Sequence, residues 1–224
     1  MKYKNLHEWG LSPKEAIRLQ RSLRDRIILK KYALKNMHTV AGVDVSVKND
    51  ISKAAIVILS YPDLQPLETV THREKTSFPY VPGLLSFREA PVILKCIAKL
   101  ETTPDVFVFD GQGLAHPRRT GLAAHMGIIF QKPSIGSAKS HLYGFYDMPG
   151  KNKGDFSLIK DQEGQAIGAV LRTRANTNPV FVSPGHLMDI PSSIKIILAI
   201  SPKYKIPEPV RAAHNAASLS SSKS

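Results

Sequence analysis

The chain has 224 residues, with 31 Lys and Arg against 18 Asp and Glu, so its formal net charge at pH 7 is +13. This length suits one domain with a substantial core, and the charge favours a polyanionic partner, nucleic acid ahead of an anionic membrane. No apolar run reaches membrane-spanning length, and the N-terminus lacks the apolar core of a signal peptide, so we expect no membrane partner. The single cysteine, Cys96, excludes an internal disulfide and favours a reducing cytoplasm.

The first predicted element is a helix over residues 12–31. Ser12 is in the N-cap position, Pro13 is the first helical residue, and Glu15 completes a capping box. An apolar stripe at helical spacing consists of Ala16, Leu19, Leu23 and Ile27. The opposite side is basic and carries Lys14, Arg18, Arg21, Arg24, Arg26, Lys30 and Lys31. This basic face is either solvated, which is usual for such a charge run, or a binding face for phosphates.

Three strands are predicted next, at 39–47, 54–59 and 67–76. A turn-like Tyr61-Pro62-Asp63 separates the second strand from the third, so the sheet should start antiparallel. Asp44 interrupts the Val-rich first strand. Because a buried carboxylate is costly unless a cation or hydrogen bonds compensate it, Asp44 is a candidate metal ligand.

A proline-flanked aromatic follows in FPYVP at 78–82. Each proline fixes its own φ and restricts the preceding residue, so this loop should be stiff. Tyr80 is either a stacking wedge beside a basic site or part of the core. Residues 83–100 are apolar at helical spacing, but Pro91 should kink or divide this helix. Glu89 is either paired with Arg88 or another cation, or is a third acid of the site.

The central stretch of the chain is VFVFDGQGLAHPRR at 106–119. Its first four residues predict a strand buried on both faces, and Asp110 stands where that strand ends. A Gly-rich loop with His116 and two arginines follows. Open α/β sheets bind ligands at such strand ends, although Asp-Gly is also a common turn signal.

The remaining chain predicts a helix at 121–130, a strand at 134–138, a polar loop or hairpin at 147–165, strands at 166–173 and 179–182, and a helix at 187–200. Lys139, at a strand end, is either a phosphate ligand or a solvated lysine. For His186 and Asp189 a capping or surface role is favoured. A last helix should begin near Pro207 and carry His214. We assign residues 1–217 to one domain and 218–224, SLSSSKS, to a disordered tail.

Four groups are candidates to converge: Asp44, Glu89, Asp110 and His214. Hard oxygen ligands, with no Cys/His cluster, favour Mg²⁺ or Mn²⁺ over zinc. A divalent cation held by carboxylates in a basic protein suits phosphodiester hydrolysis.

Five blocks of sequence resemble the endonuclease V family of deaminated-base nucleases: AGVDVS at 41–46, FPYVPGLLSFREAP at 78–91, FDGQGLAHPRRTGLAAHMG at 109–127, IGSAKSHLYG at 135–144 and SPGHLMD at 183–189. The resemblance covers nearly the whole chain except the serine tail. It implies an α/β, RNase H-like fold, a central mixed β-sheet with antiparallel first three strands and then parallel ones, flanked by helices.

The resemblance also implies the roles of individual residues. The family's metal-binding acids fall on Asp44 and Asp110, with Glu89 completing the set, His214 assisting the water or leaving group, and Lys139 near the scissile phosphate. The family's strand-separating Pro-Tyr-Ile-Pro wedge falls on Pro79, Tyr80, Val81 and Pro82, where Val replaces Ile. The lesion pocket, around a flipped hypoxanthine, falls on Gly83, Leu85, Gly111, His116, Leu122 and Gly136.

The implied function is that of a Mg²⁺-dependent DNA repair endonuclease, with Mn²⁺ as a substitute. It would recognise deaminated bases, chiefly deoxyinosine, and nick the second phosphodiester bond 3′ to the lesion, leaving a 3′-hydroxyl and a 5′-phosphate. The rival enzyme is an inosine-specific endoribonuclease on the same fold. The rival from another class is a non-catalytic nucleic-acid binding module. We expect a cytoplasmic monomer.

Overall fold

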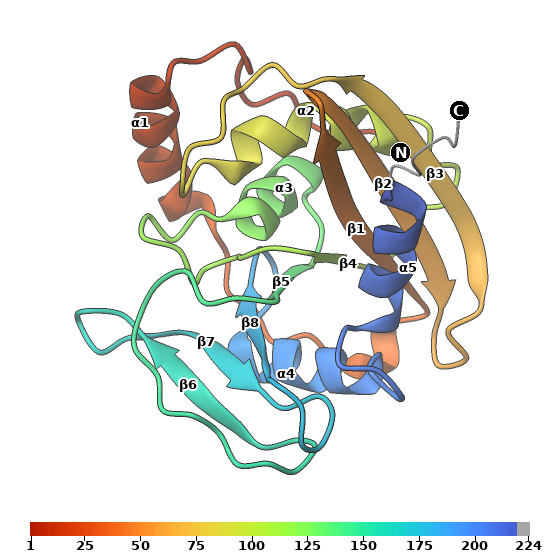
Figure 1. Ribbon diagram of the computed structural model, residues 1–224, viewed down its shortest axis with the longest axis vertical. Helices are drawn as coiled ribbons and strands as arrows, with labels where there is room; N and C mark the ends of the chain where they lie inside the picture. Colours follow the sequence, from red (N-terminus) through yellow and green to blue (C-terminus); the bar gives the residue numbers. More distant parts are fainter. Residues whose placement is uncertain (219–224) are drawn as a thin grey trace.

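The computed structural model describes residues 1–218, so the predicted tail lies outside the described residues except for Ser218. An eight-stranded sheet runs through the molecule in the order β3-β2-β1-β4-β5-β8-β7-β6 (Figure 1). The strands are β1 (Thr39–Lys48), β2 (Ile51–Ser60), β3 (Pro66–Lys75), β4 (Val106–Phe109), β5 (Ser134–Ala138), β6 (Phe156–Lys160), β7 (Ala166–Leu171) and β8 (Val180–Pro184).

Helices cover both faces of this sheet. They are α1 (Pro13–Leu23), α2 (Leu85–Ile97), α3 (Leu122–Phe130), α4 (Ile190–Ala199) and α5 (Glu208–Ala217). Successive residues of β1 point to opposite faces, so Ala41 packs in the cluster that contains α2 and α3, whereas Val40 packs in the cluster that contains α4 and α5. Both clusters reach β4, whose four residues are all buried, as the continuous apolar run predicted.

The predicted mixed sheet is confirmed, with one correction to its parallel part. The first three strands pair antiparallel, and β1, β4 and β5 pair parallel. The last three strands, however, return antiparallel to β5 and to one another. The short connections at 161–165 and 172–179 explain the β6–β7 and β7–β8 pairs, because parallel neighbours need a longer crossover connection.

The first helix begins as predicted but is shorter. The Ser12 capping box is present, and α1 ends at Leu23, followed by a 3-10 turn at Arg24–Arg26. The prediction that this helix continues to residue 31 was wrong, because the backbone at Ile28 forms hydrogen bonds with a distant part of the chain and not within a helix. The Ile28 N–H donates to His186 Nδ1 at 3.3 Å, and the Leu187 N–H donates to the Ile28 carbonyl at 2.7 Å.

Two other helix predictions are refined. Of the two outcomes predicted for Pro91, a kink or a division, division is excluded, because α2 continues through Pro91 as one helix. The helix predicted from residue 187 starts at Ile190, because the Asp189 carboxylate caps it by accepting the Ser192 N–H at 2.8 Å. The capping role favoured for Asp189 is thus confirmed. No helix within residues 1–218 is long and apolar enough to cross a membrane.

Candidate active site

Two acids meet because β1 and β4 are parallel neighbours. Val43 is in register with Phe109, and the Asp110 N–H donates to the Val43 carbonyl at 3.0 Å. Asp44 and Asp110 therefore follow at matching places on adjacent strands. The buried strand that ends in an acid, and the acid inside the first strand, were both predicted from the sequence; the register brings them together.

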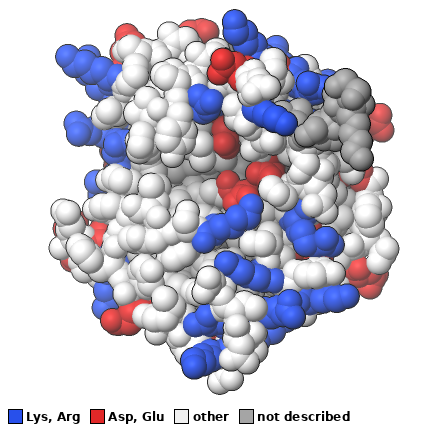
Figure 2. Space-filling model, in the orientation of Figure 1, with Lys and Arg blue, Asp and Glu red and all other residues white. Residues whose placement is uncertain are grey.

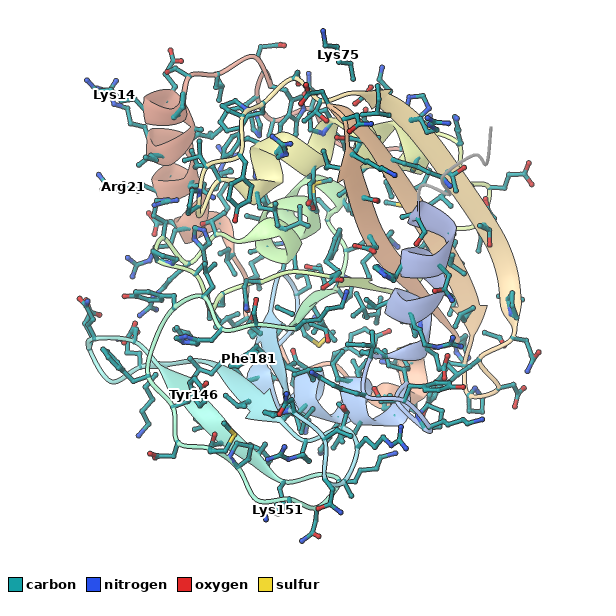
Figure 3. All side chains as sticks on the ribbon, in the orientation of Figure 1. Lys14, Arg21, Lys75, Tyr146, Lys151 and Phe181 are labelled. Atoms are coloured by element: carbon teal, nitrogen blue, oxygen red, sulfur yellow. The ribbon has the colours of Figure 1, made fainter. Side chains whose placement is uncertain are left out.

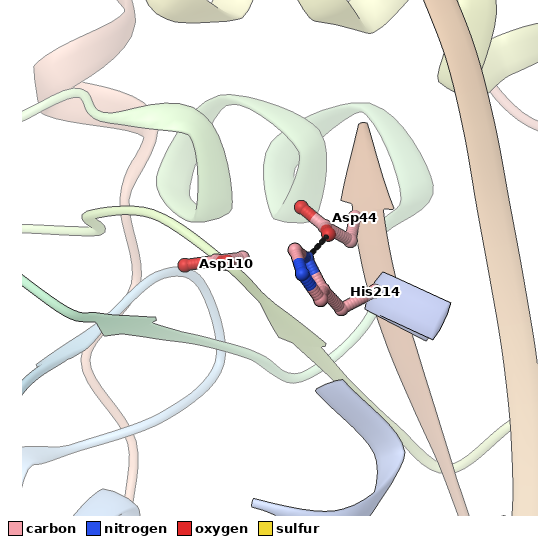
Figure 4. Close-up of side chains that lie close together, drawn as sticks. All are labelled: Asp44, Asp110 and His214. Atoms are coloured by element: carbon pink, nitrogen blue, oxygen red, sulfur yellow. Dashed lines mark hydrogen bonds and ion pairs between the residues drawn. The ribbon is translucent and has the colours of Figure 1, made fainter. Parts of the chain in front are cut away.

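His214 joins the acids from α5, which crosses β1 closely. A Cβ atom on Gly42 would lie 1.9 Å from the Pro209 carbonyl oxygen, so only glycine permits this approach. The result is a 2.7 Å contact between His214 Nδ1 and Asp44 Oδ2 (Figure 4). Sequence reasoning gave Gly42 no role, although a glycine inside a strand pattern signals close backbone contact.

The three side chains form a possible metal-binding group. One ligand atom from each of Asp44, Asp110 and His214 lies within 4.8 Å of the others. The Asp44 and Asp110 side chains are 10% and 16% exposed, whereas the His214 side chain is 55% exposed. Two carboxylates and one imidazole at this spacing fit a divalent cation, with one side open to solvent.

The electrostatics of the site favour a cation as well. Burial, and next the neighbouring Asp110, raise the pKa of Asp44, while His214 and Lys139 act in the opposite direction. Lys139 Nζ lies 2.6 Å from Asp110 Oδ2 and partly compensates its charge. Lys139 follows β5, so the predicted strand-end lysine does reach this acid. Figure 2 shows acidic side chains in a central hollow with basic side chains around it.

Glu89 faces the same place from α2 but stands apart from this group. It is 9% exposed, and burial, followed by the charges of Asp44 and Asp110, raises its pKa well above its usual value. Its neighbour Arg88 donates instead to the Phe78 carbonyl at 2.8 Å. Glu89 forms none of the ion pairs of residues 1–218, and it lies near enough to Asp44 and Asp110 for their charges to act on it; its place as third acid of the site stays a prediction.

A cavity of about 340 Å³ opens beside Asp110 and Lys139. Its volume falls in the range of small-molecule sites, about 300–1,000 Å³. Five of the six predicted pocket residues line it: Gly83, Leu85, Gly111, His116 and Leu122. Sequence reasoning missed further lining residues, namely Gln20, Ser86, Gln112, Gly121, Ala138, Ser140, His141 and Leu142.

Gly136, the sixth predicted residue, does not line the cavity. A Cβ atom there would lie 2.5 Å from the Gly111 carbonyl oxygen, so Gly136 lets β5 contact the back of the loop that forms the wall. Gly136 thus packs directly behind the Gly111 loop, and its predicted contact with a bound base stays a prediction.

One wall of the cavity is fixed by hydrogen bonds to the Gly83 carbonyl. This oxygen accepts from Gln20 Nε2 at 3.0 Å, His116 Nε2 at 2.9 Å and Arg118 Nη2 at 2.7 Å. His116 Nδ1 in turn accepts the Arg118 N–H at 3.1 Å, so the ring is neutral with its proton on Nε2. Gln20 is a polar residue on the buried face of α1, which was the signal for its role.

The predicted wedge loop stands at the cavity mouth. Tyr80 is 72% exposed, so the alternative of a core tyrosine is wrong. Tyr80, Val81 and Pro82 line the cavity, whereas Pro79 is exposed outside it. Arg88 holds the Phe78 carbonyl at one end of the loop, and a Leu84 N–H bond of 2.9 Å to the Val81 carbonyl closes the other. An exposed aromatic on a loop anchored at both ends suits insertion between bases.

Comparisons with known proteins agree on one family. The family model for Endonuclease V matches residues 21–215. A protein named Endonuclease V from Kosmotoga olearia is 47% identical over 214 residues, which is 96% of this chain and 94% of that protein. The crystal structure of the Bacillus subtilis endonuclease V superposes with a TM-score of 0.92 at 32% identity, over 97% of this chain and 95% of that one.

A second similar structure contains nucleic acid. Endonuclease V from Ciona intestinalis was crystallised with a 24mer DNA containing an inosine followed by a ribo-adenosine. It has a TM-score of 0.81 at 27% identity and covers 91% of this chain and 95% of that one.

Proposed function

This chain belongs to the endonuclease V family, a family of nucleases, and from this premise we propose that it nicks DNA beside deoxyinosine with the help of Mg²⁺ or Mn²⁺. Membership also confirms the expected RNase H-like fold. The observation that carries the proposal is the adjacency of the Asp44–Asp110–His214 group to a cavity of a size for one base. The proposed cut is the second phosphodiester bond 3′ to the lesion.

The acids and His214 would perform the hydrolysis. Asp44 and Asp110 would hold the metal, with Glu89 completing the acidic set, and the bound cation would activate water and neutralise charge on the phosphate. His214 is open to solvent on one side and hydrogen-bonded to Asp44 on the other. It can therefore orient a water or protonate the leaving oxygen. Lys139, released from Asp110 by the metal, would be free to bind the scissile phosphate.

The cavity and the wedge would perform the recognition. Tyr80 would fill the space that the flipped nucleotide leaves in the duplex. The base would enter between Gly83, Leu85 and Gly111, with His116 and Leu122 behind, where main-chain groups can bond to the edge of hypoxanthine. Gly136 would keep the Gly111 loop in place.

A nicking assay on a defined inosine duplex tests the proposal. With Mg²⁺ we expect one cut at the second bond 3′ to inosine, and no cut with chelator. Asp110→Ala should retain binding to the inosine strand and lose cleavage, because the metal performs chemistry while the basic surface binds. Cleavage by Asp110→Ala at the wild-type rate would remove the proposed metal site.

The same assay separates the rivals. The Ciona intestinalis ligand combined inosine with a ribonucleotide, so matched DNA and RNA strands with one inosine should be compared. Faster cleavage of RNA would favour the endoribonuclease. Tight binding with no cleavage of either strand in Mg²⁺ or Mn²⁺ would favour the binding module.

A further inference from the structure

A second, smaller cavity is lined in part by the residues that directly follow His116, among them Arg118, which donates to the Gly83 carbonyl. Its volume is about 130 Å³, and its lining includes Arg24, Arg118, Arg119, Tyr143, Asp161 and Glu163. Arg24 comes from the turn after α1, and the other two arginines come from the loop between β4 and α3. The sequence left two alternatives for the basic residues of the first predicted helix, a solvated face or a phosphate-binding face. One of these residues, Arg24, lines this cavity.

Positive charge is in surplus around this cavity. Three guanidinium groups (Arg24, Arg118, Arg119) and two carboxylates (Asp161, Glu163) line it, and Arg21, outside the lining, adds a further positive charge that acts on Arg118. Arg119 forms ion pairs with both acids, directly with Asp161 and at 4.0 Å with Glu163, so these two carboxylates are paired with Arg119. Arg21 and Arg24 are exposed and take part in no ion pair among residues 1–218.

Arg118 remains charged but is bonded only to neutral acceptors. Its Nε donates to Gln20 Oε1 at 2.6 Å, and its Nη2 donates to the Gly83 carbonyl. Burial, and next the charge of Arg21, lower the pKa of Arg118. Two like charges are therefore held close together, and an anion between them would relieve their repulsion.

The position of these arginines relative to the acids indicates which part of a strand they would meet. Figure 1 places α1 at one margin of the molecule, with β1 and α5 toward the other, and the loop after β4 runs between them. Figure 3 shows Lys14 and Arg21 on the outer side of α1, and basic side chains follow the same margin in Figure 2. If the strand is cut on the 3′ side of its flipped base, the 3′ side must lie over the acids. The 5′ side then extends away from the acids, toward the margin that carries the arginines.

We propose that the arginine cluster, defined as Arg21, Arg24 and Arg118, binds backbone phosphates on the 5′ side of the flipped nucleotide. The planar guanidinium group matches a phosphate with two parallel hydrogen bonds. The cluster also couples the two sites, because Arg118 holds the Gly83 carbonyl of the base pocket. This inference rests on the proposed function, which sets the direction of the strand.

The test compares two double variants with equal loss of charge. Arg21→Gln/Arg24→Gln removes the exposed members and leaves Arg118 in its supporting role. Arg26→Gln/Lys30→Gln is the control, since both residues are exposed in the adjoining segment and neither lines the small cavity, as Arg24 does, nor acts on the charge of Arg118, as Arg21 does. Binding to an inosine-containing single strand is measured with chelator over a range of salt concentrations.

The slope of log K against log salt should become shallower by about 0.7 for each lost phosphate contact on a single strand, hence by about 1.4 for Arg21→Gln/Arg24→Gln. The control should keep the wild-type slope. With an oligonucleotide that has no nucleotides on the 5′ side of the inosine, the difference in slope between wild type and Arg21→Gln/Arg24→Gln should vanish. Shortening the 3′ flank should leave that difference intact.

Equal slopes for wild type and Arg21→Gln/Arg24→Gln would overturn the inference, as would an equal loss in the control. A difference that survives removal of the 5′ flank would also overturn it. Wild-type nicking of the inosine strand, measured in parallel, separates this failure from failure of the proposed function. A wild type that nicks normally while the slopes agree would reject the arginine cluster alone.

Discussion

Protonation of His116 should destabilise the protein as pH falls, and His116→Gln should remove that part of the acid sensitivity. His116 is 2% exposed, and its Nδ1 accepts the Arg118 N–H, a hydrogen bond that only the neutral ring can make, while its Nε2 donates to the Gly83 carbonyl. Burial, followed by the charge of Arg118, lowers the pKa of His116 from 6.5 to about 4. Because the unfolded chain binds the proton first, the stabilisation is complete above about pH 6.5 and is lost as pH falls toward about 4.

The magnitude follows from the size of this shift. At about 1.4 kcal/mol for each pKa unit, the complete loss is about 3 kcal/mol, of which about 2 kcal/mol is lost between about pH 7.5 and about pH 5. Urea unfolding at these two pH values should show a loss that includes this contribution both in the wild type and in His38→Gln, an exposed histidine control. His116→Gln should lose about 2 kcal/mol less between them. An equal loss in His116→Gln and wild type would refute the assigned protonation state.

Three further substitutions test the wedge, the supporting glycine and the lysine. Tyr80→Ala should change the free energy of unfolding by less than about 0.5 kcal/mol, because the side chain is 72% exposed. It should slow nicking of duplex more than of single-stranded inosine DNA, and an equal effect on both would contradict the wedge. Gly136→Ala should destabilise by about 1–3 kcal/mol in thermal unfolding, since its Cβ would lie 2.5 Å from the Gly111 oxygen; an unchanged melting temperature would show that β5 can shift. Lys139→Gln should lower the rate of nicking while inosine binding persists. An unchanged single-turnover rate would exclude Lys139 from contact with the scissile phosphate.

Much of the local structure follows from short-range signals in the sequence. The Ser12 capping box starts α1, and the apolar run before Asp110 forms the buried β4, because both depend on neighbours within a few residues. The ends of elements were predicted less well. Where α1 stops depends on His186 and Leu187, about 160 residues further along the chain, which bind the extended backbone at Ile28.

The candidate site divides in the same way. The sequence by itself determined which residue types carry the chemistry: acids where strands end or are interrupted, a basic surplus, and a stiff loop with one aromatic residue. Only the tertiary structure decided that Asp44 and Asp110 meet, because that depends on the parallel register of β1 and β4. The tertiary structure also decided that Gly136 packs behind the Gly111 loop and that Gln20 lines the cavity. Gly42 makes the same point, since its lack of a side chain acquires meaning only where α5 contacts β1. A sequence specifies the chemical groups, whereas strand register and backbone contacts between distant segments set the distances between them.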